Sequence, residues 1–102
     1  MSYRDRIKDQ FVDKLFEAIL LLENEEECYK LFEDLCTVAE IKSLAQRLEV
    51  AKMLDKNYTY TYIAEKTGAS TATISRVKKC LHYGADGYRL ILNRLKEQGK
   101  SE

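Results

Sequence analysis

The sequence predicts an all-α protein. Three observations support this: the 102 residues contain no proline, only four glycines, all of them at or after Gly68, and 45% apolar residues. Because the first two thirds of the chain lack strong breakers, long helices are favoured over a turn-rich β fold. The length suits one compact domain, 1–102.

A first helix is predicted from Tyr3 to Leu22. Its second half, Leu15 to Leu22, carries one charge in eight residues and is too apolar for a helix with one face in water. A second covering surface is therefore expected, and in so short a chain its source is another copy, in a homodimer. The apolar positions recur at steps of three and four residues: Ile7, Phe11, Leu15, Ala18, Ile19 and Leu22.

A second helix is predicted after Asn24, whose side chain is placed to cap it, with three carboxylates near its positive end. It is expected to end near Leu35. Its apolar positions, expected to be buried, are Cys28, Leu31, Phe32 and Leu35.

A capping box at Thr37 and Glu40 predicts the start of a third helix, from Val38 to about Asp55. Its apolar residues keep helical spacing at Ile41, Leu44, Ala45, Leu48, Ala51 and Met53 or Leu54. The segment that follows, Asn57 to Tyr62, alternates like a strand, but no second strand exists to pair with it, so a strand is rejected.

Residues 60–79 fit a helix-turn-helix. Ala64 is small where the two helices would touch, and Gly68 stands in the turn, where a positive φ costs glycine little. Ile63, Ile74 and Val77 would fill the wedge between the helices. An ordinary αα-hairpin has the same packing needs, so this pattern alone leaves that alternative open.

The composition of the second helix favours DNA binding. If Ile74 and Val77 face inward, the outward face is small, rich in hydroxyls and basic, without an acidic residue from Ser70 to Tyr83. Short side chains allow close approach to a major groove, hydroxyls can bond to bases or phosphates, and cations neutralise phosphates. The predicted DNA-binding residues are Ser70, Thr71, Ala72, Ser75, Arg76 and Lys79.

A last helix is predicted from Ala85 to Leu95, after a left-handed cap at Gly84. Its apolar positions Tyr88, Ile91, Leu92 and Leu95 are expected in the core, and Arg89, Arg94 and Lys96 on a solvated face. His82 stands alone, so we interpret it as a partly exposed spacer or a phosphate contact.

Seventeen basic and seventeen acidic residues cancel, but they are unevenly placed. Residues 1–34 hold five basic and ten acidic side chains, whereas 35–102 hold twelve and seven. A neutral chain thus has a basic second part, where the proposed reading helix lies.

Catalysis and metal binding are not expected. The cysteines Cys28, Cys36 and Cys80 are odd in number and lack CxxC spacing, so we predict reduced thiols, two or three of them buried, and no zinc site. No nucleophile has an adjacent base and no glycine-rich phosphate loop is present. No apolar run of 18 residues or secretory leader is found, which predicts a cytoplasmic protein without membrane contact.

The span from Leu35 to about Leu95 resembles the core of the Trp repressor family. The resemblance rests on the capped helix at Thr37, the aliphatic segment from Leu44 to Leu54 with Arg47 inside it, and GASTATISR at the start of the reading helix. It implies a six-helix chain forming an intertwined homodimer, with dimerisation helices in 1–36 and a core in 37–98.

The resemblance also implies a ligand site. In the family an indole lies between two arginines, which match Arg47 and Arg76, and a threonine at the place of Thr37 helps to hold the ligand. Val77 replaces a family glycine and Cys80 replaces a serine that contacts the ligand, and both departures argue against tryptophan as corepressor.

The resulting hypothesis is a homodimeric, sequence-specific transcriptional regulator, a repressor, that binds double-stranded DNA and needs no cofactor. One alternative is a helical protein-interaction module without DNA binding. Another is a DNA-binding regulator switched by a small molecule other than tryptophan, seated near Arg47.

Overall fold

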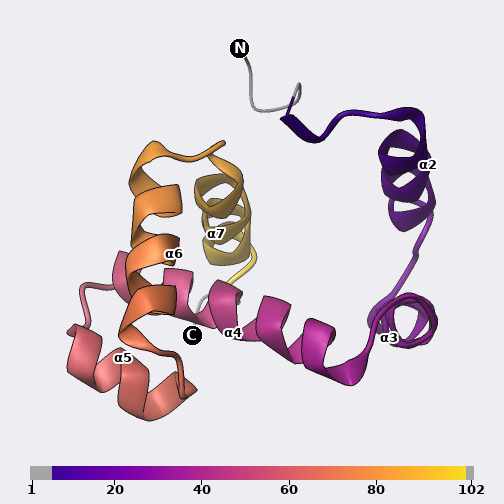
Figure 1. Cartoon of the computed structure of the whole chain (residues 1–102). Helices are drawn as coiled ribbons and strands as arrows, with labels where there is room; N and C mark the ends of the chain where they lie inside the picture. Colours follow the sequence, from indigo (N-terminus) through magenta and orange to yellow (C-terminus); the bar gives the residue numbers. More distant parts are fainter. Residues whose placement is uncertain (1–5, 101–102) are drawn as a thin grey trace. The chain divides into compact units, whose positions relative to one another are not determined.

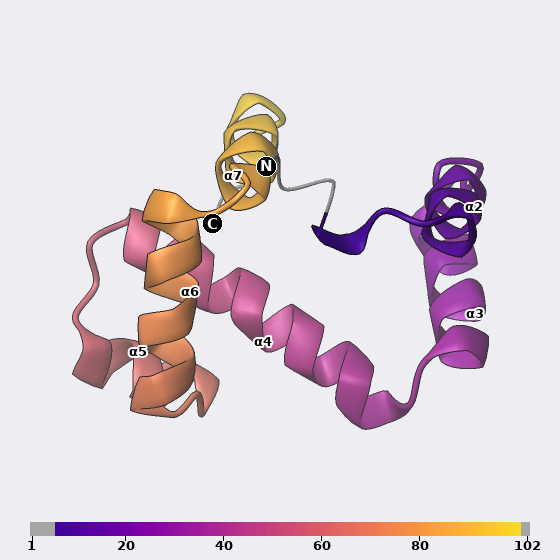
Figure 2. The same cartoon turned by 45° about the horizontal axis from the view of Figure 1, so that its top comes forward.

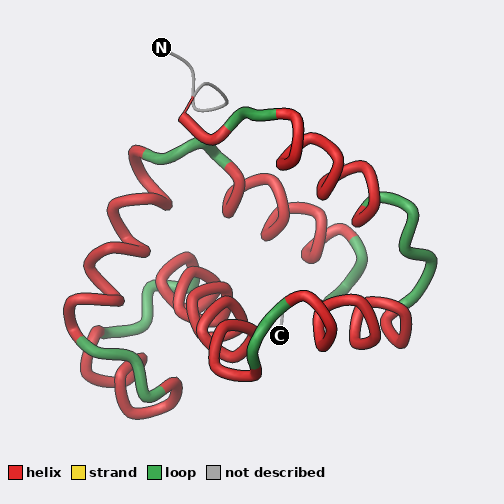
Figure 3. The backbone as a smooth tube through the Cα atoms, turned by 45° about the vertical axis from the view of Figure 1, so that its right-hand side comes forward, coloured by secondary structure: helices red, strands yellow, loops and turns green. Residues whose placement is uncertain are grey.

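The computed structural model describes residues 6–100, and Figure 3 shows that every segment of this part is helix or loop. Contacts divide the chain into two compact units, Met1–Ile41 and Lys42–Glu102. The division lies close to the predicted boundary between 36 and 37, and the single domain over 1–102 stays a prediction. None of the described helices is both long and apolar enough to cross a bilayer.

The first unit contains α2 (Gln10–Ile19), which is shorter than the helix predicted from Tyr3 to Leu22. The helix begins late because Asp9 has extended backbone angles and caps it, its Oδ1 accepting from the Val12 N–H at 2.8 Å. Leu20 forms the C-cap. Residues 1–5 lie outside the described part of the chain.

Helix α3 (Glu25–Leu35) confirms the predicted cap at Asn24. Its Oδ1 accepts from the Glu27 N–H at 3.0 Å, and the Glu27 carboxylate accepts from the Glu23 N–H at 2.9 Å. The predicted burial is wrong for this single chain: Cys28 and Leu35 are exposed and Leu31 and Phe32 only partly covered, because α2 and α3 contribute no residue to a core.

The capping box before α4 (Val38–Asp55) is confirmed. The Thr37 N–H donates to Glu40 Oε1 at 2.8 Å and the Glu40 N–H donates to Thr37 Oγ1 at 3.1 Å. The hydrogen bond from the Thr37 backbone to the Glu40 carboxylate is the main cause that lowers the pKa of Glu40, and the Thr37 side chain adds to it. Within α4, Leu44 and Leu48 remain exposed, so only its C-terminal part joins the core.

Helix α5 (Tyr60–Thr67) replaces the strand that alternation alone would suggest. Asn57, with the left-handed φ of +66°, changes the direction of the backbone after α4. Thr59 Oγ1 then caps the new helix by accepting from the Tyr62 N–H at 3.1 Å. The rings of Tyr58 and Tyr62 then stack with centroids 4.9 Å apart. The prediction that this segment is not a strand is confirmed.

The core of the second unit forms where α6 (Thr71–Tyr83) packs against both α5 and α7 (Gly87–Glu97) (Figure 1). Figure 2 shows α5 beside the N-terminal half of α6, with α7 at the other end of that helix. The end of α4 supplies the remaining apolar contacts. The buried residues are Val50, Ala51, Met53, Ile63, Ala69, Ile74, Val77, Leu81 and Leu92.

The predicted left-handed cap at Gly84 is wrong. Gly84 has φ −86° and ψ −151°, and the left-handed residue is Asp86, with φ +66°. The last helix consequently runs from Gly87 to Glu97, later than predicted. Glycine is needed at 84 because an added Cβ would lie 2.3 Å from the carbonyl oxygen of Cys80.

Asp55, at the end of α4, makes two ion pairs with α7. Arg89 Nη1 lies 2.6 Å from Asp55 Oδ1, and Lys96 Nζ lies 2.8 Å from Oδ2. Lys96 and Arg94 are exposed and Arg89 is partly exposed, as the predicted solvated face of α7 requires, but their pairing with a carboxylate of α4 was not predicted. The hydrogen bond from Lys96 is the main cause that lowers the pKa of Asp55.

Replacing Asp55 by Asn should lower the free energy of unfolding by about 1–3 kcal/mol at neutral pH, since two charge-assisted hydrogen bonds are lost. A lowered pKa means that the carboxylate stabilises the fold fully above its unfolded pKa of about 3.9 and loses this effect as pH falls through the folded value. Urea unfolding between neutral and acidic pH should show the two proteins converging at low pH.

Asp86→Asn is the matched control, since Asp86 makes no side-chain capping bond. It should change stability by less than about 0.5 kcal/mol. An Asp55→Asn protein as stable as the control at neutral pH would contradict the ion-pair argument.

Candidate nucleic-acid interface

The turn between α5 and α6 is fixed by backbone geometry and side-chain hydrogen bonds. Gly68 has φ +74°, as predicted, and its N–H donates to the Ala64 carbonyl at 2.9 Å. Thr67 Oγ1 donates to the Ile63 carbonyl at 2.7 Å and accepts from the Ala69 N–H at 3.1 Å. The direction in which α6 leaves the turn is therefore defined.

A side chain from α4 also holds this turn. Gln46 Nε2 donates to the Thr67 carbonyl oxygen at 3.0 Å. The bond satisfies a carbonyl at the end of α5, where intrahelical partners run out. Sequence reasoning missed Gln46 and Thr67, because a polar residue inside a helical pattern gives no sign of the distant carbonyl that it meets.

Ser70 forms the N-cap of α6. Its Oγ accepts from the Thr73 N–H and donates to Thr73 Oγ1, both at 3.1 Å. Ser70 was predicted to contact DNA; the structure adds a capping role that the sequence analysis did not assign, and the hydroxyl remains at the exposed start of the helix.

The inward side of α6 is formed as predicted. Ile74 is 0% exposed and Val77 is 1% exposed, and Leu81 continues the same buried side. Because one side of the helix is fixed in the core, the opposite side must face solvent. All six predicted DNA-binding residues are exposed: Ser70, Thr71, Ala72, Ser75, Arg76 and Lys79.

The exposed face of α6 is positive. Helix α6 contains no acidic residue, and its first turn carries none to offset the partial positive charge of the amino end. Within residues 6–100, neither Arg76 nor Lys79 makes an ion pair. Both cations are therefore available to an anionic partner.

The residues of the predicted ligand site belong to both units. Thr37 lies in the first unit, where its hydroxyl belongs to the capping box. Arg47 lies in the second unit and points back along α4, with Nε 3.4 Å from the Ser43 carbonyl oxygen and Nη2 3.5 Å from Ser43 Oγ.

Tyr88 of α7 lies within electrostatic reach of the other predicted ligand residues. The pKa of its phenol is raised, mainly by burial. The positive charges of Arg47 and Arg76 oppose this shift, and Cys80 adds to it. Arg47, Arg76 and Cys80 thus all act electrostatically on one phenol. Sequence analysis assigned Tyr88 only to the core, and its spacing gave no other signal.

The predicted burial of two or three cysteines is wrong in this single chain: Cys28 and Cys80 are exposed and Cys36 is partly exposed, so none is buried. All three are free thiols. Among the described residues, no group of three His, Cys, Asp or Glu side chains is placed to hold a metal ion.

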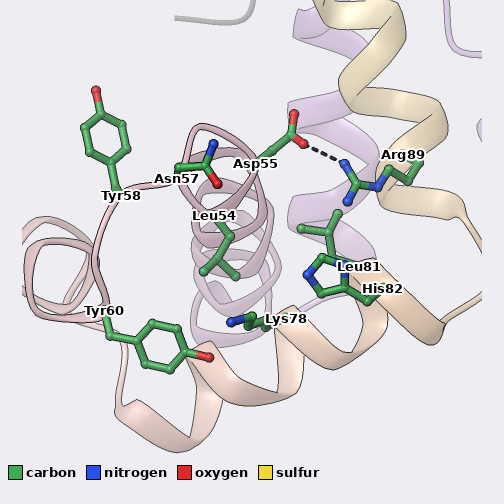
Figure 4. A pocket seen from close by; sticks show the side chains of 9 residues that line it. All are labelled: Leu54, Asp55, Asn57, Tyr58, Tyr60, Lys78, Leu81, His82 and Arg89. Atoms are coloured by element: carbon green, nitrogen blue, oxygen red, sulfur yellow. Dashed lines mark hydrogen bonds and ion pairs between the residues drawn. The ribbon is translucent and has the colours of Figure 1, made fainter.

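Two cavities lie in the second unit. One, of about 370 Å³, is lined by residues of α4, α6 and α7 and by the segment entering α5, including the exposed His82 (Figure 4). The other, of about 390 Å³, lies between α4 and α5 beside Tyr58 and Tyr62. Neither is lined by Arg47, Arg76 or Cys80.

The fold and the exposed face of α6 define an all-α helix-turn-helix protein. Residues 10–96 match the family described as Trp repressor protein. The chain belongs to the Trp repressor family.

Relatives and solved structures agree with this membership. The uncharacterized protein YerC of Bacillus subtilis (strain 168) is 58% identical over 93 residues, covering 91% of this chain and 89% of YerC. A crystal structure of a Staphylococcus aureus protein, provisionally assigned as a Trp repressor, has a TM-score of 0.89 at 54% identity, covering 94% of this chain and 96% of the other. A TrpR-like protein from Eubacterium eligens ATCC 27750 has a TM-score of 0.87 at 58% identity, covering 90% and 95%. The six-helix fold is thereby confirmed for the described residues.

Gly68→Ala should lower the free energy of unfolding by about 1–2 kcal/mol, since an L-residue with φ +74° is strained. The added Cβ meets no atom closer than 3.9 Å, so the loss should reflect backbone conformation alone. Urea unfolding measures it. Gly87→Ala is the control, with an ordinary φ and open space around its Cβ, and should not destabilise; equal losses in both proteins would rule out the positive-φ argument.

Proposed function

We propose that the protein is a sequence-specific, DNA-binding transcriptional regulator, a repressor, that acts as a homodimer. The observation that carries the proposal is the orientation of α6, whose buried side fixes an exposed side that is basic and free of acidic residues. Membership of the Trp repressor family supports the same function.

The exposed residues suit a helix lying in a major groove. Ala72 and Ser75 are short enough to let the helix approach base edges, and the Thr71 methyl or Ala72 can contact a thymine methyl. Arg76 and Lys79 supply the positive charge that phosphates require. Phosphate contacts would position the helix, and base contacts would give it sequence preference.

A second copy would cover the apolar surface of the N-terminal helices. Leu20 is 83% exposed and Leu21 78% exposed, and no residue of α2 or α3 is buried. Large exposed apolar surfaces of this kind belong to interfaces. Two copies related by two-fold symmetry would present two reading helices to a roughly palindromic operator.

Tryptophan is not part of the proposal. Val77, which replaces the family glycine and follows Arg76 in the sequence, packs in the core, and the charges of Arg47 and Arg76 act on the Tyr88 phenol. A regulator that needs no tryptophan is consistent with these substitutions.

Replacing Arg76 and Lys79 by Ala should weaken binding to a duplex selected from a random pool. Each lost phosphate contact should reduce the slope of log affinity against log salt by about 1. Fluorescence anisotropy across a salt series measures both quantities, and far-ultraviolet circular dichroism checks that helix content is unchanged.

The matched control is Arg94→Ala, which removes an exposed arginine of α7 and should leave the salt slope unchanged. If no duplex were selected from the pool by the unaltered protein, DNA binding would be wrong, and the helical interaction module would become the better hypothesis.

Replacing Leu20 and Leu21 by Lys should convert the dimer to a monomer, because two charges would be placed in an apolar interface. Sedimentation equilibrium at several protein concentrations measures the mass. Glu17→Lys is the control, since it changes the charge of α2, just before Leu20, by two units without removing apolar surface, and it should remain dimeric. A monomeric unaltered protein would contradict the proposed assembly.

A further inference from the structure

We propose that the cavity bounded by α4, α5, α6 and α7 binds a small organic anion with a flat apolar part, and that this ligand weakens DNA binding. The cavity is the one shown in Figure 4. The regulatory half of the proposal rests on the proposed function; the binding half does not.

The charges around the cavity favour an anion. Asp55 is the one acidic residue among those that line it, and Arg89 and Lys96 already contact both of its oxygens, at 2.6 and 2.8 Å. Lys78 adds a further cation from α6. The positive charge here exceeds the negative, and a carboxylate or phosphate group would offset it.

An aromatic wall lies beside the Lys78 cation. Lys78 Nζ is 5.6 Å from the centroid of the Tyr60 ring, and Figure 4 shows the two side chains directed toward one another, whereas Tyr58 points away. Leu54 and Leu81 add apolar surface. A ligand whose anionic group meets Lys78 could place an apolar ring against Tyr60.

The size and mixed lining agree with a small-molecule site. The volume of about 370 Å³ lies in the range of about 300–1,000 Å³ typical of ligand pockets, which combine apolar walls with a few polar groups. Four helices contribute to one small space, so a bound molecule would contact each of them.

The cavity and the DNA-reading face share helix α6. Lys78 and His82 line the cavity, and Lys79, the neighbour of Lys78, lies on the exposed face. An anion held by Lys78 would reduce the positive potential that attracts phosphates to the same helix. Because such coupling is reciprocal, bound DNA would weaken binding of the anion by the same factor.

The test uses benzoate as the probe, with benzyl alcohol as its neutral counterpart and inorganic phosphate as an anion without a ring. In a titration of the ¹⁵N-labelled full chain, benzoate should shift the amide signals of Tyr60, Lys78, His82 and Arg89. Both other probes should bind at least about tenfold more weakly, since each lacks one half of the recognised chemistry.

Lys78→Ala should weaken benzoate binding at least about tenfold, since the variant loses the charge-assisted contact. Lys66→Ala is the matched control: Lys66 Nζ lies 5.5 Å from the centroid of the Tyr62 ring, outside this cavity, and its removal should leave benzoate binding unchanged. Saturating benzoate should reduce the affinity for the selected duplex about fivefold in the unaltered protein and not in Lys78→Ala.

Shifts that are equal for benzoate and benzyl alcohol, or equal in Lys78→Ala and the unaltered protein, would overturn the anion site. If the amide signals of these residues shift with duplex alone and with no small anion, the anion site is also overturned. The residues that line the cavity would then be contacts for the DNA backbone. If benzoate binds as expected but no duplex binds, the proposed function is wrong while the anion site stands.

Discussion

The burial of one side of α6 is the constraint on which the rest of the structure depends. Ile74 and Val77 lie in the core between α5 and α7, so the rotation of the helix about its own axis is set by packing and not by any partner. Ser75, Arg76 and Lys79 consequently face solvent in a fixed pattern. Under the proposed function, a face that is already fixed in the free protein would lose little conformational freedom when DNA binds.

The two units of the chain differ in what they bury. Among residues 6–100, every buried residue belongs to the second unit, whereas α2 and α3 supply apolar side chains that the single chain leaves uncovered. The same division is visible in the charges, since the acidic excess of residues 1–34 is separated from the basic second part. Helix α6 itself carries no carboxylate that would repel the phosphates of the proposed DNA partner.

Features governed by local chemistry could be predicted from the sequence. The caps at Asn24 and Thr37, the positive φ of Gly68 and the inward side of α6 all follow from neighbouring residues, and all are found in the structure. Features that depend on distant contacts could not be. The ion pairs of Asp55 join residues 34 and 41 positions apart. One local feature was also missed: Gly84 is extended, and an added Cβ would lie 2.3 Å from the carbonyl oxygen of Cys80, four residues earlier.

The hydrogen bond from Gln46 to the Thr67 carbonyl makes the turn between α5 and α6 depend on a residue outside the motif. Gln46 of α4 lies 21 positions before Thr67 in the sequence and holds the turn between the two helices of the motif. A shorter or branched side chain at 46 would free that turn without altering a single exposed residue of α6. Under the proposed function, operator preference could change through substitutions in α4 as well as in α6, so comparing the sequences of α6 alone would underestimate how far related regulators have diverged.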